Sequence, residues 1–418
     1  MKNKSLTPKI RFKGYDDEWQ QAKVRDVFTL GNGYTPSKAN PAFWTNGTIP
    51  WFRMEDIREN GRVLADSIQH VTPEAVKSSG LFPAGSIIVS TTATIGEHAL
   101  LIADSLANQR FTVFQTVNRW SWLKAKYLLY RFYGLGDWCR KNVNAGGLAA
   151  VSITDLQKYD IDFPSTAEER DSIADYFDNI DKLLVDTERE ITRLEKMKQA
   201  SLQKMFPRPG ETTPEIRFNG FTEQWKLIQL RHICESFKYG LNAPAKKFDG
   251  IHKYLRITDI DDTTHQFNQA DLTSPDAGPL TEEYRLHLND IVFARTGASV
   301  GKTYLYDEKD GDVYWAGFLI CAHVSNEFDS SFIFYITTTR MYWDYIAISS
   351  QRSGQPGVNA EQYAEFSFYV PTLPEQKRIG EYFRNLDAII SAKRKKLEKL
   401  QNLKQSCLDK MFVNTTVQ

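Results

Sequence analysis

Two segments of the chain share one spacing of apolar residues. In each segment, apolar residues fall on a spacing of alternating four and three residues. The two sets are Ile173, Phe177, Ile180, Leu184, Ile191, Leu194 and Met205, and Ile379, Phe383, Leu386, Ile390, Leu397, Leu400 and Met411. A 3.5-residue period sustained this long predicts a coiled-coil seam. Pro164 and Pro374 mark the helix starts, and roughly 38 residues at 1.5 Å each predict rods of about 57 Å.

Polar residues interrupt both seams at matching places. Thr187 and Lys198 interrupt the first, and Lys393 and Lys404 interrupt the second. A polar seam residue favours one register at some cost in stability, which is the interpretation we prefer. The basic run at residues 393–396 fits either a solvated helix face or a contact with phosphate.

The matching helices belong to a repeat that fills the chain. The stretch from Thr7 to Trp19 returns from Thr213 to Trp225, a shift of 206 residues. The stretch at 198–206 returns at 404–412 with the same shift, and half of 418 residues is 209. A repeat of this length fixes the architecture. It predicts a pseudo-twofold molecule suited to partners with two similar ends.

Between these matching ends, each half holds a dissimilar middle of about 130 residues, 20–152 and 226–358. Short β-rich runs at 86–90 and 290–293, separated by turn signals, predict an α/β domain on a mixed or curled sheet. Two anchors recur: 51–57 echoes 254–260, and 94–96 echoes 299–301. The loops around them differ, as expected of recognition modules, because binding residues concentrate on loops.

Composition and charge limit the function classes. The chain has 52 basic and 52 acidic residues, and this balance counts mildly against a nucleic-acid binder without excluding a local positive surface. The four cysteines form no Cys-x-x-Cys pair, which favours a reducing compartment. No apolar run is long enough for a membrane span or a secretory signal. We therefore expect a cytoplasmic protein with no membrane contact.

Motifs that would indicate catalysis are incomplete. The stretch 297–303 resembles a phosphate-binding loop but has three residues between its glycines where four are needed. The stretch 40–43 is similar to the adenine-binding loop of amino-methyltransferases, but it lacks the second proline and has no glycine-rich cofactor motif before it. The histidines show no metal-ligand spacing. We expect no catalytic, cofactor-binding or metal site in this chain.

Taken in order, several short strings resemble the specificity subunit of type I restriction–modification systems. They are 33–37 followed by 49–51, 85–91 running into 94–96, 108–111, the openings of the two helices at 163–164 and 370–371, and, in the second half, 301–302 and 353–355. The resemblance covers essentially the whole chain. Two departures concern which bases are read: Thr92-Ala93 stands where many members have Arg-Gly, and residues 241–244 replace a Thr-Pro-Ser turn.

The resemblance implies an α+β protein with two globular α/β target-recognition domains, each followed by a long helix, the two helices pairing as an antiparallel coiled coil. We assign residues 1–152 and 213–358 to the recognition domains and 153–212 and 359–418 to the spacer helix regions. Each domain would read half of an asymmetric bipartite site in double-stranded DNA. Two modification subunits would methylate adenine N6 with S-adenosylmethionine, and two motor-nuclease (restriction) subunits would use ATP and Mg. The chain itself would be non-catalytic.

Candidate DNA-reading residues follow from base-edge chemistry. Arginine and lysine pair with guanine, asparagine and glutamine with adenine, and hydroxyls with either. The candidates are Thr35, Ser37, Lys38, Arg53, Thr91, Thr92, Gln109 and Arg110 in the first domain, and Tyr239, Arg256, Arg295, Thr296, Lys302, Arg352, Ser353 and Gln355 in the second. Each could instead form a turn or contact a phosphate. Trp51 and Trp315 fit core aromatics better than stacking platforms.

Two other functions remain open. A coiled-coil adaptor that binds proteins would show partner affinity independent of salt, whereas a DNA reader loses affinity steeply as salt rises. A self-contained methyltransferase or nuclease is disfavoured by the incomplete motifs.

Overall fold

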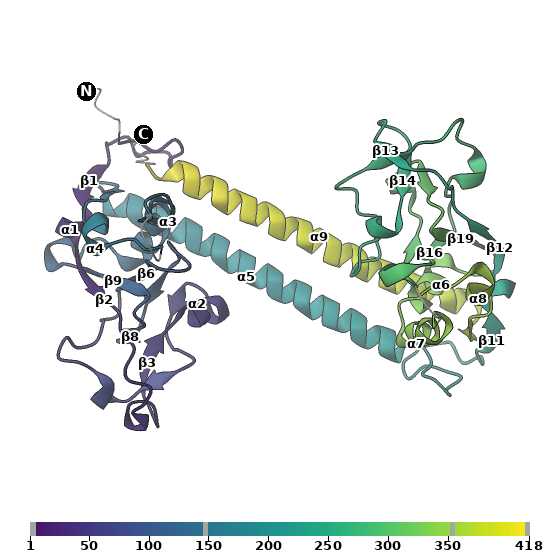
Figure 1. Cartoon of the computed structure of the whole chain (residues 1–418), viewed down its shortest axis with the longest axis horizontal. Helices are drawn as coiled ribbons and strands as arrows, with labels where there is room; N and C mark the ends of the chain where they lie inside the picture. Colours follow the sequence, from purple (N-terminus) through teal and green to yellow (C-terminus); the bar gives the residue numbers. More distant parts are fainter. Residues whose placement is uncertain (1–5, 145–148, 352–355, 414–418) are drawn as a thin grey trace. The chain divides into compact units, whose positions relative to one another are not determined.

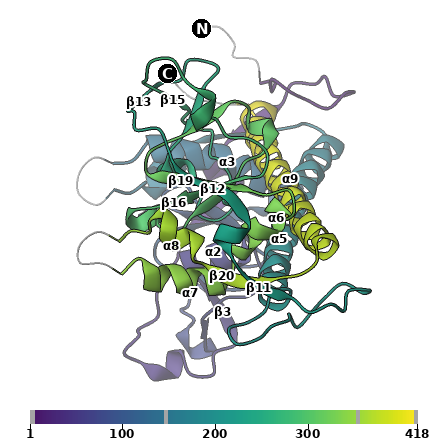
Figure 2. The same ribbon diagram turned by 90° about the vertical axis from the view of Figure 1, so that its right-hand side faces the viewer.

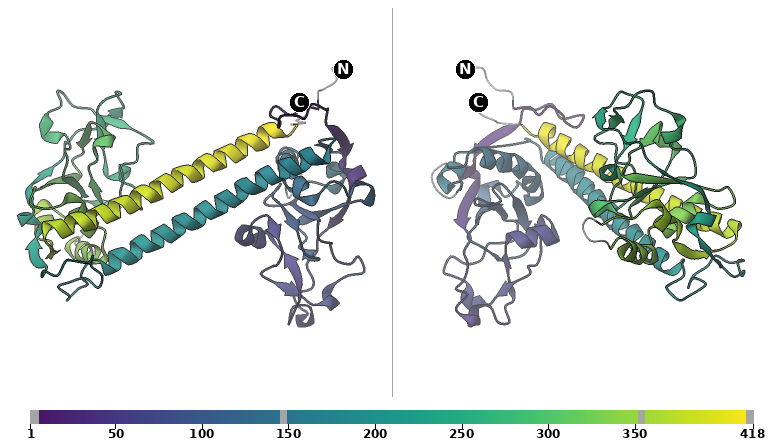
Figure 3. Two further views of the ribbon diagram at one scale, coloured as in Figure 1. Left: turned by 180° about the vertical axis from the view of Figure 1, so that it is seen from behind. Right: turned by 45° about the vertical axis from the view of Figure 1, so that its right-hand side comes forward.

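The computed structural model describes residues 6–144, 149–351 and 356–413, which form two compact units (Figure 1). Unit 1 comprises Met1–Asp186 with Leu397–Gln418, and unit 2 comprises Thr187–Lys396. Two long helices, α5 (Ala167–Lys204) and α9 (Leu373–Met411), each contribute one part to unit 1 and one part to unit 2. Both are continuous ribbons (Figure 3). The two helices predicted from the apolar period are confirmed, with starts close to the predicted prolines.

Unit 1 is built on a five-stranded sheet in the order β2-β9-β6-β7-β4, in which only the β4–β7 pair is parallel. The buried run at 87–90 forms a central strand, as its continuous apolar character predicts. A three-stranded sheet in the order β5-β3-β8 and the β1–β10 pair complete the unit. The strands of unit 1 are β1 (Gln20–Lys23), β2 (Phe28–Asn32), β3 (Ile49–Phe52), β4 (Val63–Leu64), β5 (His70–Val71), β6 (Ile87–Ser90), β7 (His98–Leu101), β8 (Leu106–Ala107), β9 (Phe111–Thr116) and β10 (Asp160–Phe163). Its shorter helices are α1 (Val24–Val27), α2 (Met54–Asn60), α3 (Ala125–Lys141), α4 (Ile153–Leu156) and the 3-10 turns η1 (Pro41–Phe43), η2 (Pro73–Ala75) and η3 (Asn118–Trp120).

Unit 2 repeats this plan on an antiparallel four-stranded sheet in the order β12-β19-β16-β17. Helices α6, α7 and α8 lie along one side of this sheet (Figure 2) and share its larger apolar core. The strands of unit 2 are β11 (Lys226–Gln229), β12 (Cys234–Tyr239), β13 (Ala245–Lys247), β14 (Lys253–Leu255), β15 (Thr273–Pro275), β16 (Asp290–Ala294), β17 (Thr303–Leu305), β18 (Val313–Trp315), β19 (Leu319–Val324) and β20 (Ser367–Val370). Its shorter helices are α6 (Ser330–Ile336), α7 (Arg340–Ser349), α8 (Ala360–Ala364) and the 3-10 turns η4 (Leu230–His232), η5 (Ile257–Asp259), η6 (Glu282–Tyr284), η7 (Gly297–Ser299) and η8 (Glu308–Asp310).

Within each unit, a stretch of α5 packs against a stretch of α9, and the contacts run antiparallel. In unit 1, the ammonium of Lys404 pairs with Asp181, whose carboxylate also accepts a hydrogen bond from the Tyr130 hydroxyl (3.1 Å). In unit 2, Lys198 pairs with Asp387 (2.7 Å), which accepts from the Tyr335 hydroxyl (2.8 Å). The polar seam lysines therefore each meet one acid of the facing helix, and this agrees with the register interpretation.

Two residues of the basic run at 393–396 of α9 contribute to the pairing of the two long helices. Lys393 pairs with Glu190, and Arg394 with Glu195 (2.6 Å), both across to α5 within unit 2. These contacts are interhelical ion pairs, so the seam residue Lys393, like Lys198 and Lys404, meets an acid of the facing helix.

The end of each half is buried in the unit formed mainly by the other half. The Phe412 ring stacks on Phe177 in unit 1 (ring centroids 5.8 Å apart), and the Phe206 ring stacks on Phe383 in unit 2 (5.9 Å). Backbone hydrogen bonds repeat the pattern: Ile10 N–H donates to Lys410 O (3.0 Å), and Ile216 N–H donates to Lys204 O (2.8 Å). The sequence match of the two tails therefore reflects one packing motif used twice.

A buried ion pair fixes the start of each long helix. In unit 1, the Arg11 guanidinium donates two hydrogen bonds to Glu169, from Nε (2.6 Å) and Nη2 (2.8 Å). In unit 2, Arg217 donates in the same way to Glu375 (2.8 and 2.7 Å). Each carboxylate lies in the first turns of its helix, where the helix dipole also favours negative charge. These hydrogen bonds raise the pKa of both arginines.

Candidate functional site

In unit 1, four segments meet at one end of the main sheet. The N–H of Gly33, after β2, donates to Phe111 O (2.9 Å), and the N–H of Thr91, after β6, donates to Arg110 O (3.0 Å). The N–H of Asn108 donates to Phe52 O (3.0 Å), which brings in Arg53 at the start of α2. We call the residues 33–38, 53, 91–97 and 108–110 the loop edge of unit 1.

Unit 2 builds the same edge with the same backbone bonds. The N–H of Gly240 donates to Leu319 O (3.1 Å), that of Arg295 to Phe318 O (3.1 Å), and that of Ala316 to Leu255 O (3.0 Å). Residues 239–244, 256, 295–302 and 316–318 form the loop edge of unit 2. The bonds equate Thr91 with Arg295 and Arg110 with Phe318. The sequence anchors at 51–57 and 254–260 lie in equivalent places, as the echo predicted.

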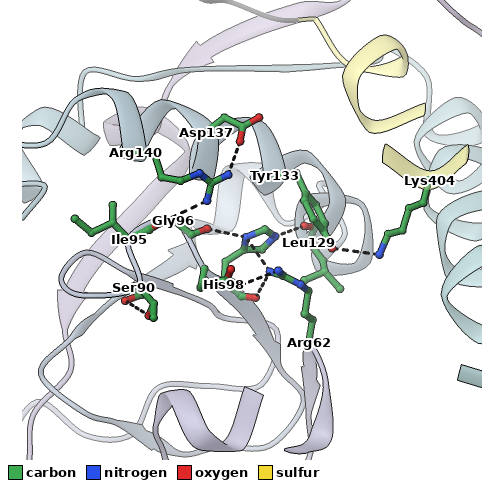
Figure 4. Close-up of polar contacts among 12 residues, drawn as sticks. Arg62, Ser90, Ile95, Gly96, His98, Leu129, Tyr133, Asp137, Arg140 and Lys404 are labelled. Carbon is green, nitrogen blue, oxygen red and sulfur yellow. Dashed lines mark hydrogen bonds and ion pairs between the residues drawn. The ribbon is translucent and has the colours of Figure 1, made fainter. Parts of the chain in front are cut away.

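The turn after β6 has a defined conformation in unit 1. Ser90 Oγ donates to Thr92 O (2.8 Å), and Arg140 Nη1, from α3, donates to Ile95 O (3.4 Å; Figure 4). Gly96 has φ +87° and lies so close to α3 that a Cβ would stand 2.4 Å from Gly136 O. Ala93 has φ 61°, in the region that favours glycine, and its counterpart Gly297 in unit 2 has φ 70°. A glycine would therefore adopt the backbone conformation of Ala93 with less strain.

Unit 2 holds the equivalent turn with tyrosines. The Tyr363 hydroxyl donates to Ala294 O (2.7 Å) and accepts from Gly301 N–H (3.2 Å), and the Tyr342 hydroxyl donates to Gly301 O (2.9 Å). Burial raises the pKa of both phenols, so they stay neutral and keep donating near neutral pH. Both units therefore present their loop edge on a rigid support, as positioned recognition residues require.

Behind the turn of unit 1 lies a small cavity of about 150 Å³. Figure 4 shows His98 between Arg62 and the backbone of α3, with Nε2 lying 2.8 Å from Leu129 O. Burial lowers the pKa of His98 to about 3, and the nearby Arg62 contributes to the shift. The arginines that line the cavity are paired, Arg62 with Glu97 (2.7 Å) and Arg140 with Asp137. Because these side chains are engaged with one another inside the unit, His98, Arg62 and Arg140 support the turn from within.

The predicted readers of unit 1 gather at its loop edge but differ in availability. Ser37, Lys38, Gln109 and Arg110 are exposed, and the Thr35 hydroxyl donates to Gln109 Oε1. Thr91 is buried, and Thr92 forms a bridge to Ala150 through the backbone. The Arg53 guanidinium lies 3.8 Å from Asp56 and 5.6 Å from the centroid of the Trp51 ring.

The predicted readers of unit 2 show the same division. Tyr239 is exposed, and the Arg295 guanidinium lies over its ring at 4.9 Å from the centroid. Arg256 donates two hydrogen bonds to Asp259, both of 2.8 Å, and Lys302 pairs with Asp262. Thr296 forms a backbone bridge to Gly357. The candidates Arg352, Ser353 and Gln355 lie outside the described residues.

Sequence reasoning missed Phe318, a residue that is 61% exposed at the loop edge of unit 2. The repeat could not have revealed it, because the sequence shift of 206 residues takes Arg110 to Ala316. The equivalence of Phe318 with the predicted reader Arg110 follows only from the backbone hydrogen bonds. Trp51 and Trp315 are buried core residues, as expected.

The part of the chain that the structure describes holds neither a metal-binding cluster nor a membrane-spanning helix. Among residues 6–144, 149–351 and 356–413, no group of three or more His, Cys, Asp or Glu side chains could hold a metal ion. Over the same residues, no helix combines the length and apolar character that crossing a membrane requires.

Two similar sheet modules, each with a rigidly supported edge of divergent loops and each joined to paired helices, define a two-module recognition protein. The comparisons specify the class further. The chain belongs to the family of the type I restriction modification DNA specificity domain, whose model matches residues 16–196 and 222–402.

Several relatives carry that description. The chain is 46% identical over 162 residues to the EcoprrI specificity subunit of Escherichia coli, and 29% identical over 215 residues to the EcoR124I/EcoR124II specificity subunit of the same organism. These matches span 40% and 51% of the relatives and 38% and 48% of this chain. The fold is similar to that of the S subunit of the type I system of M. genitalium, with a TM-score of 0.62 at 17% identity, covering 98% of this chain and 100% of that one.

Proposed function

We propose that this specificity subunit reads duplex DNA through its two loop edges, one half-site per unit. The supporting observation is that the two edges share their backbone hydrogen bonds but carry different side chains, such as Thr91 against Arg295. A common scaffold explains how both modules approach DNA alike, and the divergent side chains explain how each reads different bases. The target is therefore bipartite and not palindromic.

Exposed hydrogen-bonding and cationic groups at the edges fit this task. Lys38, Gln109 and Arg110 in unit 1 and Tyr239 in unit 2 are exposed. With the half-buried Arg295 that lies over the Tyr239 ring, they are the side chains we assign to DNA contact most directly. Arg53, Arg256 and Lys302 already have carboxylate partners within the protein. To contact DNA, each would have to leave its carboxylate or bind the carboxylate and the DNA at the same time. Because the whole chain has no net charge, part of the attraction to phosphate would come from partner subunits.

The long helices would set the gap between half-sites. We assign residues 1–152 and 213–358 to recognition and residues 153–212 and 359–418 to the spacer regions. Removing residues 187–193 together with 392–398 takes one heptad from each helix and keeps the seam in phase. Seven residues at 1.5 Å correspond to about 10 Å, or about three base pairs at 3.4 Å each. The preferred gap should shorten accordingly or recognition should be lost, and an unchanged gap would argue against this role.

The chemistry would belong to partners. Two modification subunits would bring S-adenosylmethionine and methylate adenine N6, and two motor-nuclease subunits would bring ATP and Mg. The specificity subunit would position them relative to the DNA. Methylome sequencing of cells that express the chain with its modification subunit tests this directly, because one bipartite methylated motif is expected.

An adaptor that binds only proteins is the competing function. The complex with the modification subunit should bind its motif with an affinity that falls steeply as salt rises, through release of counterions. Arg295→Ala and Arg110→Ala should each relax discrimination at one half-site, whereas loss of a phosphate contact would weaken binding to all sequences alike. Binding that ignores both DNA sequence and salt would favour the adaptor.

A further inference from the structure

Phe318 is an aromatic side chain that the fold holds out toward solvent. It is 61% exposed, although its backbone is fixed on both sides. Its carbonyl accepts from Arg295 N–H (3.1 Å), and the next residue, Leu319, donates to Ala316 O (2.8 Å). The ring therefore cannot easily fold back into the core, and exposing it carries a hydration cost that contact with an apolar partner would remove.

The position of this ring is the one that Arg110 occupies in unit 1. Arg110 accepts from Thr91 N–H through its carbonyl, and Phe318 accepts from Arg295 in the same way. The preceding residue also differs, Gln109 in unit 1 and Gly317 in unit 2. At one backbone position, unit 1 thus offers charge and hydrogen-bond donors, and unit 2 offers an apolar ring preceded by a glycine that has no side chain.

The groups beside Phe318 favour DNA as the occupant. Arg295, its hydrogen-bonded neighbour, stacks on Tyr239, which is itself 45% exposed. The buried Nε of Arg295 has no hydrogen-bond partner among the described residues. The Arg295 cation and the exposed aromatic rings together fit a partner surface that carries negative charge and also an isolated apolar group. In the major groove, that apolar group is the C5-methyl of thymine.

We propose that Phe318 is a specificity-determining residue that reads a thymine in the half-site of unit 2 through its C5-methyl group. This inference rests on the proposed function and adds a base identity to it. The geometric counterpart, Arg110, would read its own half-site by hydrogen bonding, so the two modules would use unlike chemistry at one shared position.

The test uses the complex with its modification subunit and the motif found by methylome sequencing. Each thymine of the motif is replaced in turn by deoxyuridine, which lacks only the methyl group, and Kd is measured by fluorescence anisotropy. The wild type should lose about fourfold in affinity at one thymine, the effect of one buried methyl group. Phe318→Ala should bind more weakly and be insensitive to deoxyuridine there, whereas Phe318→Leu should retain part of the sensitivity.

A matched control is Leu227→Ala, since Leu227 is 60% exposed but lies on β11, outside the loop edge. It should leave both affinity and the deoxyuridine response unchanged. The inference is overturned if no thymine shows the response, or if Phe318→Ala keeps it. It is also overturned if Phe318 acts as a wedge between bases, which would show as increased 2-aminopurine fluorescence without any methyl dependence. Failure of the proposed function would look different, because wild-type protein would then show no sequence-dependent binding at all.

Discussion

The ion pair between Arg11 and Glu169 offers a sharp test of what holds unit 1 together. The Glu169 side chain is fully buried, accepts two charge-assisted hydrogen bonds from Arg11 and lies 3.4 Å from Trp19 Nε1. Glu169→Gln preserves the shape but removes the charge and turns an NH₂ donor toward an arginine that is only 11% exposed. Breaking one partner of such a buried pair costs about 3–5 kcal/mol, because the other charge remains desolvated.

The assay is hydrogen–deuterium exchange, which reports opening free energies segment by segment. In Glu169→Gln, protection should fall by about 3 kcal/mol or more in peptides of unit 1 that contain Trp19 and the start of α5. Peptides of unit 2 should change little. The repeat supplies the matched control, because Glu375→Gln breaks the equivalent pair with Arg217 and should open unit 2 instead.

A double-mutant cycle separates the pair from other effects. Arg11→Met removes the stranded charge, so the double variant should be more stable than the sum of the single changes predicts, with a coupling energy of about 2–4 kcal/mol. The reasoning is refuted if Glu169→Gln lowers protection by less than about 1 kcal/mol, or if both units open equally.

Three further outcomes are expected, each measured by the same exchange method. Burial lowers the pKa of His98 to about 3 in the folded chain, against about 6.5 in the unfolded chain, so the unfolded state binds an extra proton between these pH values. The free energy of unfolding of unit 1 should therefore fall by about 2 kcal/mol between pH 7 and pH 5. His98→Gln should abolish this fall, and a variant that keeps the same pH dependence of stability would contradict the assignment. Ala93→Gly should stabilise its turn by about 0.5–1 kcal/mol and Gly297→Ala should destabilise the equivalent turn, because both positions have positive φ, which strains a residue with a Cβ. Stability changes of the opposite sign would show that this backbone strain is absent. Phe412→Ala should destabilise unit 1 by about 3–5 kcal/mol and Phe206→Ala should destabilise unit 2, although each residue lies at the end of the other half of the repeat. If Phe412→Ala opened unit 2 and Phe206→Ala opened unit 1, the packing of each tail in the unit of the other half would be contradicted.

The long helices and the duplication were readable from the sequence because both are periodic. The apolar seam, including the buried Ile191 and Ile390, follows from a 3.5-residue repeat that any packed helix pair must satisfy. The β-rich runs at 87–90 and 290–294 were equally visible, since continuous apolar runs bounded by turns favour central strands. Local pattern was sufficient for these elements.

The composition of the loop edges was only partly readable. Residue type alone proposed Arg53 and Arg256 as equals of Arg110, but the fold gives the first two nearby carboxylates and leaves the third exposed. Phe318 was missed because an isolated phenylalanine in a sequence fits a core position at least as well as an exposed one.

The sequence by itself therefore determined the repeat, the two helices and the family. Tertiary structure decided which segments converge, which arginines are already engaged and which aromatic stays outside. The reason is physical: periodicity is a property of neighbours along the chain. In contrast, the loop edges depend on hydrogen bonds between strands about twenty or more residues apart, and the Arg11–Glu169 pair joins residues 158 positions apart.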